Sequence, residues 1–224
     1  GQAHLAWAED TTQEAPAGYG FSQPFATTEA TIQQCATCHS RREAHTDASP
    51  EPGTPYHDAY GLALLRPGLY HADGQILDEV YVAGSFLQSK MYAAGVGCLD
   101  CHDAHSAMRV AEGNAVCTQC HSPAGNPDFP TITPAEYDAP EHHFHEPGTE
   151  GAQCKSCHAP ESVYMGNDWR ADHSFRIPRP DLAAGTGAPD ACTTCHTDPA
   201  RIGPAGSTSM PTARSWTTSR STQT

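Results

Sequence analysis

The sequence predicts a fold of mostly coil with short α-helices and little β-structure, whose core is not built from its own side chains. Leu, Ile, Val and Phe together make only 26 of the 224 residues, and the formal net charge is −14. A chain with so few core-forming residues and so high a charge does not bury enough apolar surface to offset the entropy lost on folding. The 19 Gly and 19 Pro favour turns over long regular elements.

The cysteines indicate what supplies the core. All ten fall in pairs separated by two residues, and a histidine follows each pair at once. The pairs are Cys35/Cys38, Cys98/Cys101, Cys117/Cys120, Cys154/Cys157 and Cys192/Cys195, followed by His39, His102, His121, His158 and His196. Cys-x-x-Cys-His is the attachment motif of c-type haem, in which two thioethers hold the porphyrin edge and the histidine binds the iron as proximal ligand.

Zinc sites, disulfides and thioredoxin-like redox motifs are the competing interpretations. A structural zinc site takes four Cys or His ligands, which an odd number of pairs does not fill, and it gives no reason for a histidine at one fixed offset. A redox motif would not recur five times in so short a chain. The sequence therefore predicts five haem c groups, with their iron, stacked as the core of the fold.

The spacing of the motifs bears on how the haems are arranged. Successive first cysteines are 63, 19, 37 and 38 residues apart. Because 19 residues are too few for a folded layer between two porphyrins, haems 2 and 3 are expected to lie in near contact.

Nine histidines remain as distal ligands, enough for every haem to be bis-histidine. His105 follows the second motif too closely to reach the far face of its own haem, so we expect it to bind a different haem. In the run 141–148, His142 and His145 would share a helical face, whereas His143 and His145 would point apart in an extended segment. The predicted distal ligands are His4, His105, His143, His145 and His173, with His142, His71, His45 and His57 as weaker candidates.

The remaining chain divides into an arm, a haem domain and a tail. Residues 1–30 read as an extended N-terminal arm, 31–200 as the pentahaem domain, and 201–224 as a Ser/Thr-rich tail with 11 Ser/Thr among its last 18 residues. Residues 44–58 and 122–140 are also expected to be extended. The clearest helix is predicted over 77–94, ending before Gly95.

A resemblance to a known family refines these expectations. The segments CLDCHDAHSAM (98–108) and NAVCTQCH (114–121) resemble the doubled CXXCH motif of multihaem cytochromes. With EHHFHEPGTEGAQCKSCHAP (141–160) and ACTTCH, they are similar to the haem part of tetratricopeptide-repeat-associated multihaem c-type cytochromes, distantly like the cytochrome c-554 and hydroxylamine oxidoreductase superfamily. The likeness covers roughly residues 1–197. It implies that His105, His143, His145 and His173 bind haem iron, and that the segment around His4 follows an earlier haem motif in longer members.

The attachment and coordination of the haems predict where the protein acts and what it does. Haem c is attached outside the energy-coupling membrane, so the chain is expected to be exported, periplasmic or extracellular, and no apolar run is long enough to form a transmembrane segment. Bis-histidine haems are coordinatively saturated, which favours electron transfer with other redox proteins over catalysis, so no catalytic residue is predicted. One form of this hypothesis is a homopolymer, a cytochrome filament. An acidic surface disfavours nucleic acid as a partner.

Two alternatives stay open. One is an oxidoreductase of small nitrogen or sulfur oxyanions, which requires a haem with an open distal face. The other is a haem subunit that docks on a membrane redox complex by means of its negative charge.

Overall fold

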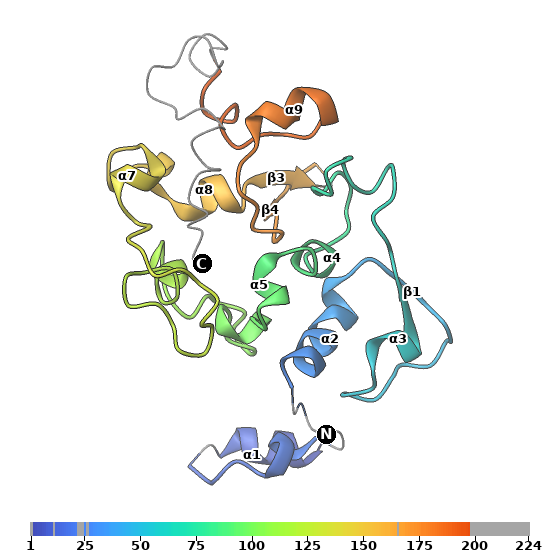
Figure 1. The fold of residues 1–224 in the computed structure, drawn as a ribbon. Helices are drawn as coiled ribbons and strands as arrows, with labels where there is room; N and C mark the ends of the chain where they lie inside the picture. Colours follow the sequence, from blue (N-terminus) through green and yellow to red (C-terminus); the bar gives the residue numbers. More distant parts are fainter. Residues whose placement is uncertain (1, 11, 22–24, 26, 165, 198–224) are drawn as a thin grey trace, which may run out of the picture. The chain divides into compact units, whose positions relative to one another are not determined.

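The computed structural model describes residues 2–10, 12–21, 25, 27–164 and 166–197. Figure 1 shows short helices and a few short strands joined by long connecting segments, and the strands pair as β1 with β2 and β3 with β4. The prediction of mostly coil with short helices and few strands is confirmed. The chain divides into two compact units. Unit 1 contains residues 1–70, 76–112 and 172–175, and unit 2 contains residues 71–75, 113–171 and 176–224. The predicted tail over 201–224 lies outside the described residues.

Unit 1 is organised around α2 (Thr28–His39), its longest helix. The Thr27 hydroxyl caps it by accepting a hydrogen bond from the Ala30 amide, and Glu29 lies in the first turn, where a negative charge is favourable. Ala36 on this helix packs with Tyr56 and Ala83 in a cluster of buried residues. The other elements of unit 1 are α1 (Gln2–Glu9), η1 (Ala17–Gly20), β1 (Arg42–Ala44), α3 (Tyr56–Ala59), β2 (Tyr60–Leu62), α4 (Ala83–Phe86), α5 (Lys90–Ala93) and η2 (Cys98–Asp100).

The single helix predicted over 77–94 is wrong. The segment forms two separate turns, α4 and α5, and residues 77–82 are not helical. The chain bends before α4 because Tyr81 takes a left-handed conformation, with φ at 60°. It bends again before α5, where the Ser89 hydroxyl accepts from the Tyr92 amide and caps a new helix.

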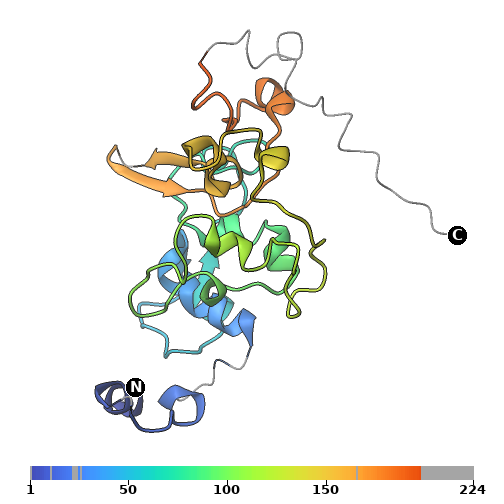
Figure 2. The same cartoon turned by 90° about the vertical axis from the view of Figure 1, so that its left-hand side faces the viewer.

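The arm predicted over 1–30 also differs in detail, since residues 2–9 form helix α1 instead of extended chain. Helix α1 and turn η1 lie side by side (Figure 1; Figure 2). Gly20 makes this approach possible, because a β-carbon there would lie 2.7 Å from the backbone nitrogen of His4. Gly20 also has a φ of 74°, which favours glycine.

Unit 2 holds the remaining elements, all short. They are α6 (Ala115–Thr118), α7 (Pro140–His143), η3 (Glu150–Ala152), α8 (Cys154–His158), β3 (Glu161–Tyr164), β4 (Asp168–Ala171) and α9 (Pro180–Thr186). Strands β3 and β4 form an antiparallel hairpin with Val163 opposite Trp169. Asn114 joins distant segments, because its amide donates to the Ala152 carbonyl and to Asp138 and accepts from the Cys154 amide.

Within the described part of the chain, no helix combines the length and the apolar character needed to cross a lipid bilayer.

Candidate haem sites

Every Cys-x-x-Cys-His motif is wound into a turn of helix. The first motif ends helix α2 and the fourth makes up α8. In the other three, the amide of the motif histidine donates to the carbonyl of the first cysteine at 2.9 Å, for His102, His121 and His196. One helical turn therefore sets both thiols and the imidazole at fixed offsets, as attachment along a porphyrin edge requires.

Cysteines of different motifs also lie side by side. In unit 1, a hydrogen bond with the Cys98 thiol lowers the pKa of Cys35 to about 7, and the same bond raises the pKa of Cys98. In unit 2, a hydrogen bond with the Cys117 thiol lowers the pKa of Cys154. The attachment points of the first and second motifs are thus adjacent, as are those of the third and fourth. The expected contact between haems 2 and 3 involves motifs in different units and stays a prediction.

Two predicted attachment points, Cys120 and Cys195, lie in different surroundings from these paired thiols. The Cys120 sulfur accepts a hydrogen bond from the Asn126 side-chain amide at 3.2 Å, within its own loop. Cys195 is exposed. It also acts on a cysteine of the fourth motif, because burial, and then the charges of Cys154 and Cys195, raise the pKa of Cys157. Contacts between thiols therefore do not confirm Cys120 and Cys195 as thioether sites. Their role follows from the spacing of the motif and stays a prediction.

The backbone nevertheless holds both cysteines in the turn that the motif requires. The amide of Cys120 donates to the Cys117 carbonyl at 3.1 Å, and that of Cys195 donates to the Cys192 carbonyl at 3.3 Å. The two cysteines of each pair are thus set one turn apart, which is the arrangement that attachment to neighbouring vinyl groups needs.

Three motif histidines each face a second histidine at a characteristic distance. The ring centres are 6.4 Å apart for His102 and His173, 6.0 Å for His142 and His158, and 5.9 Å for His145 and His196, with interplanar angles of 27°, 11° and 40°. Two imidazoles that bind one metal ion from opposite sides, each at about 2.0 Å, have ring centres about 6 Å apart. These pairs therefore have the spacing of the two axial ligands of one haem iron.

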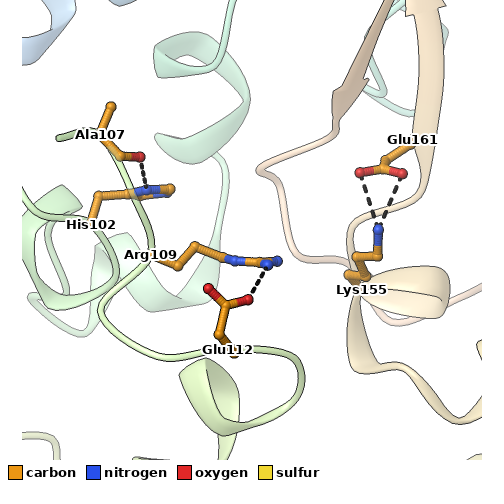
Figure 3. Close-up of polar contacts among 6 residues, drawn as sticks. All are labelled: His102, Ala107, Arg109, Glu112, Lys155 and Glu161. Atoms are coloured by element: carbon orange, nitrogen blue, oxygen red, sulfur yellow. Dashed lines mark hydrogen bonds and ion pairs between the residues drawn. The ribbon is translucent and has the colours of Figure 1, made fainter. Parts of the chain in front are cut away.

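Backbone carbonyls orient a ring in each of the three pairs. The ring Nδ1 of His102 donates to the Ala107 carbonyl at 3.2 Å, as Figure 3 shows, and that of His158 donates to the Arg176 carbonyl at 2.8 Å. The Nδ1 of His145 donates to the His143 carbonyl at 2.5 Å. A hydrogen bond from Nδ1 places the proton there and leaves the Nε2 lone pair free for a metal. Sequence reasoning missed these acceptors because any residue type offers a carbonyl.

Local contacts position the second histidine of two pairs. Next to His173, the buried carboxylate of Asp172 accepts from the amides of Ile76 at 3.2 Å and Ser174 at 2.8 Å. His145 lies against Gly151, where a β-carbon would be 2.6 Å from its Cγ. Glycine at this position is what lets the ring stand opposite its motif histidine.

Charged side chains form ion pairs close to two motifs. Lys155, inside the fourth motif, binds Glu161 at 3.3 Å, and Arg109 binds Glu112 at 3.1 Å (Figure 3). All four side chains are two-fifths exposed or more, so these pairs contribute little stability. They do neutralise two of the few cations of the acidic chain.

The other two motif histidines, His39 and His121, are not paired with a facing histidine among the described residues. Among the described residues, the ring contact recorded for His121 is with Tyr137, edge-on at 5.7 Å, and no histidine ring faces His39. Tyr137 also meets His142 edge-on at 5.4 Å, so it lies between histidines of the third and fourth sites. Burial, and then the charge of His158, lower the pKa of His121. A cavity of about 150 Å³ adjoins Cys38 of the first motif, with Arg42 and Tyr56 among its lining residues.

The predicted distal residues are thus brought together in part. His173 and His145 each face a motif histidine, whereas in the run 141–148 it is His142 that stands opposite His158. The Nδ1 of His143 accepts from the His145 amide at 3.2 Å. His4 and His105 face each other, at 6.0 Å and 11°. His45, His57 and His71 stay candidate ligands for the first and third sites.

Comparisons with known proteins concern the doubled motif and the fold. A family model of the doubled CXXCH motif matches residues 91–126. No curated protein matches the chain in sequence. Among solved structures, the crystal structure of the outer cell wall cytochrome OcwA matches 86% of this chain with a TM-score of 0.54 and 15% sequence identity. The chain spans 52% of the length of that protein, and at this identity the likeness concerns the fold. The predicted resemblance to multihaem cytochromes with a doubled motif is confirmed.

Proposed function

We propose that the chain is a multihaem c-type cytochrome that transfers electrons through five closely spaced c-type haems, a proposal that the doubled CXXCH motif and the similarity in fold support. The observation that carries this proposal is the pairing of histidines at the separation of axial ligands, three times with a motif histidine as one member. The proposed pairs are His102 with His173 for haem 2, His142 with His158 for haem 4, and His145 with His196 for haem 5.

Coordination by two histidines fits electron transfer better than catalysis. An iron with both axial positions filled has no place for a substrate, and it changes oxidation state with little rearrangement of its ligands. The haems of a conduit must also lie close together. The neighbouring thiols of Cys35 and Cys98, and of Cys117 and Cys154, support short distances between haems 1 and 2 and between haems 3 and 4.

The surroundings of the protein are part of the proposal. Haem c attachment implies export, and the similarity in fold to a protein described as an outer cell wall cytochrome supports a place outside the cell membrane. The net charge of −14, with two lysines in the chain, would favour a basic redox partner by electrostatic steering. A homopolymer is the finer form of this proposal, and size-exclusion chromatography at high concentration tests it: monomers alone would remove it.

Low-temperature electron paramagnetic resonance of the oxidised protein, with haem counted by the pyridine haemochrome method, tests the proposal. We expect five covalently attached haems, all low-spin, because each iron has two strong nitrogen ligands. A high-spin signal equal to one haem would contradict full coordination and favour the oxidoreductase alternative. His39 and His121, the proximal ligands whose partners are unassigned, would then be the sites to examine with nitrite and hydroxylamine.

A further inference from the structure

The fourth pair of facing histidines lies outside the five motifs. His4 and His105 stand with ring centres 6.0 Å apart and an interplanar angle of 11°, the same values as the pair His142 and His158. Yet neither His4 nor His105 follows a cysteine pair, because Ala3 and Ala104 precede them. This pair therefore has the geometry of two axial ligands without any motif to which either ligand belongs.

We propose that His4 and His105 are the two axial ligands of a sixth haem, which the chain holds without a thioether bond. The reasoning is a count of coordination positions. A haem attached through Cys-x-x-Cys-His uses one axial position of its iron for the histidine of that motif. An iron bound by both His4 and His105 has no position left for a motif histidine, so none of the five cysteine pairs serves it. This inference goes beyond the proposed function, since electron transfer through five haems needs no sixth.

The contrast with a second contact of the same ring argues against simple aromatic stacking. His4 also lies against Phe21, with ring centres 4.5 Å apart and an interplanar angle of 26°. For near-parallel rings that shorter distance is the one of face-to-face contact, whereas tilted or edge-on rings, such as those of Tyr137 and His142, meet at 5.4 Å. The His105 ring is 1.5 Å farther away, and this matches a metal ion placed between two imidazoles.

A specially shaped turn orients His4 for a metal. Its Nδ1 donates to the Tyr19 carbonyl at 2.8 Å, which leaves Nε2 as the free lone pair, as in the motif pairs described above. The carbonyl is presented by three successive left-handed residues, Gly18, Tyr19 and Gly20, with φ values of 61°, 53° and 74°. A left-handed tyrosine is strained, and such strain is retained where the local structure serves a site.

The opposite ligand stands on an equally well-defined loop. The Asp103 carboxylate accepts from the amides of His105 and Ser106, at 3.2 and 2.8 Å. Farther along, the Val110 amide donates to the Cys101 carbonyl at 2.9 Å and closes the loop.

Exposed apolar side chains flank both ligands. Leu5, next to His4, is 62% exposed, and Met108, three residues after His105, is 61% exposed. A porphyrin offers an apolar surface that such side chains would cover, whereas a bare metal ion gives no reason for them. These neighbours are why we assign haem to the pair.

Extraction of non-covalent haem tests the assignment on the whole 224-residue chain. Acidified butanone removes haem held by axial ligands alone and leaves thioether-bound haem on the protein. Added haemin is then titrated into the extracted and refolded protein, with the Soret band as the readout. We expect one equivalent of extractable haem b in addition to the covalent haem c, and its loss in His4→Ala and in His105→Ala. Glu9→Ala, an exposed change on the same helix, should retain it.

The covalent haem count in the same samples separates this inference from the proposed function. Five covalent haems with no extractable haem and no binding of added haemin would overturn the sixth site and leave the conduit intact. Extractable haem that persists in both histidine variants would also overturn it. A metal found without porphyrin absorption would replace haem by a bare ion and refute the proposal. Fewer than five low-spin covalent haems would contradict the proposed function instead.

Discussion

Replacing Gly151 by alanine should detach His145 from the fifth haem. The added β-carbon would lie 2.6 Å from Cγ and 2.8 Å from Nε2 of the His145 ring. Contact between carbon atoms is comfortable at about 3.5 Å, and Cδ2 of the ring lies closer still than Cγ, so the ring would have to move by at least about 0.9 Å. Movement of the ring is restricted, because its Nδ1 donates to the His143 carbonyl at 2.5 Å.

A shift of that size is decisive for a metal ligand. Lengthening an iron–nitrogen bond of about 2.0 Å by nearly half removes the ligand from the coordination sphere. We therefore expect one haem in five to become high-spin in the oxidised protein, together with a loss of about 1–3 kcal/mol in the free energy of unfolding from overpacking.

Electron paramagnetic resonance and thermal denaturation measure these two effects. Gly185→Ala is the matched control, since no atom lies within 4 Å of its added β-carbon. If Gly151→Ala kept every haem low-spin with unchanged stability, the assignment of His145 to the fifth haem would be refuted.

Three further predictions concern other positions. His142→Ala should produce one high-spin haem while His143→Ala should not, as measured by the same resonance; the reverse result would refute the assignment of His142 to haem 4 and favour the predicted ligand His143. Asp172→Ala removes the hydrogen bonds that this carboxylate accepts from two amides near His173, so stability should fall by about 1.5–3 kcal/mol per bond, with a high-spin signal from haem 2. An unchanged melting temperature would count against that role. Asn114→Ala removes three hydrogen bonds worth about 0.5–1.5 kcal/mol each, so the melting temperature should fall while the haem count stays the same. An unchanged melting temperature would contradict this expectation.

The helix predicted over 77–94 shows how sequence reasoning fails in such a chain. The prediction assumed that the apolar residues of this segment pack against a protein core, but the core among the described residues is small and local. Gly84, inside the segment, lies against the Tyr70 hydroxyl, and a β-carbon there would collide with it. This approach is a tertiary contact, so local propensity did not predict it, and local propensity also disfavours the left-handed conformation of Tyr81.

The sequence by itself determined the attachment chemistry and the general character of the fold. Two thiols and a histidine within five residues act through one helical turn, so their geometry is local and is visible in the letters alone. The scarcity of apolar residues likewise predicted coil and short helices, because without burial long elements gain no stability.

Only the tertiary structure decided which histidines face each other. His102 meets His173 from 71 residues away, and His142 rather than His143 stands opposite His158. Such pairs depend on where the chain returns in space and on which backbone carbonyl fixes each ring. Spacing along the sequence carries neither, since a rotation of one residue in the run 141–145 turns a different imidazole toward the same position.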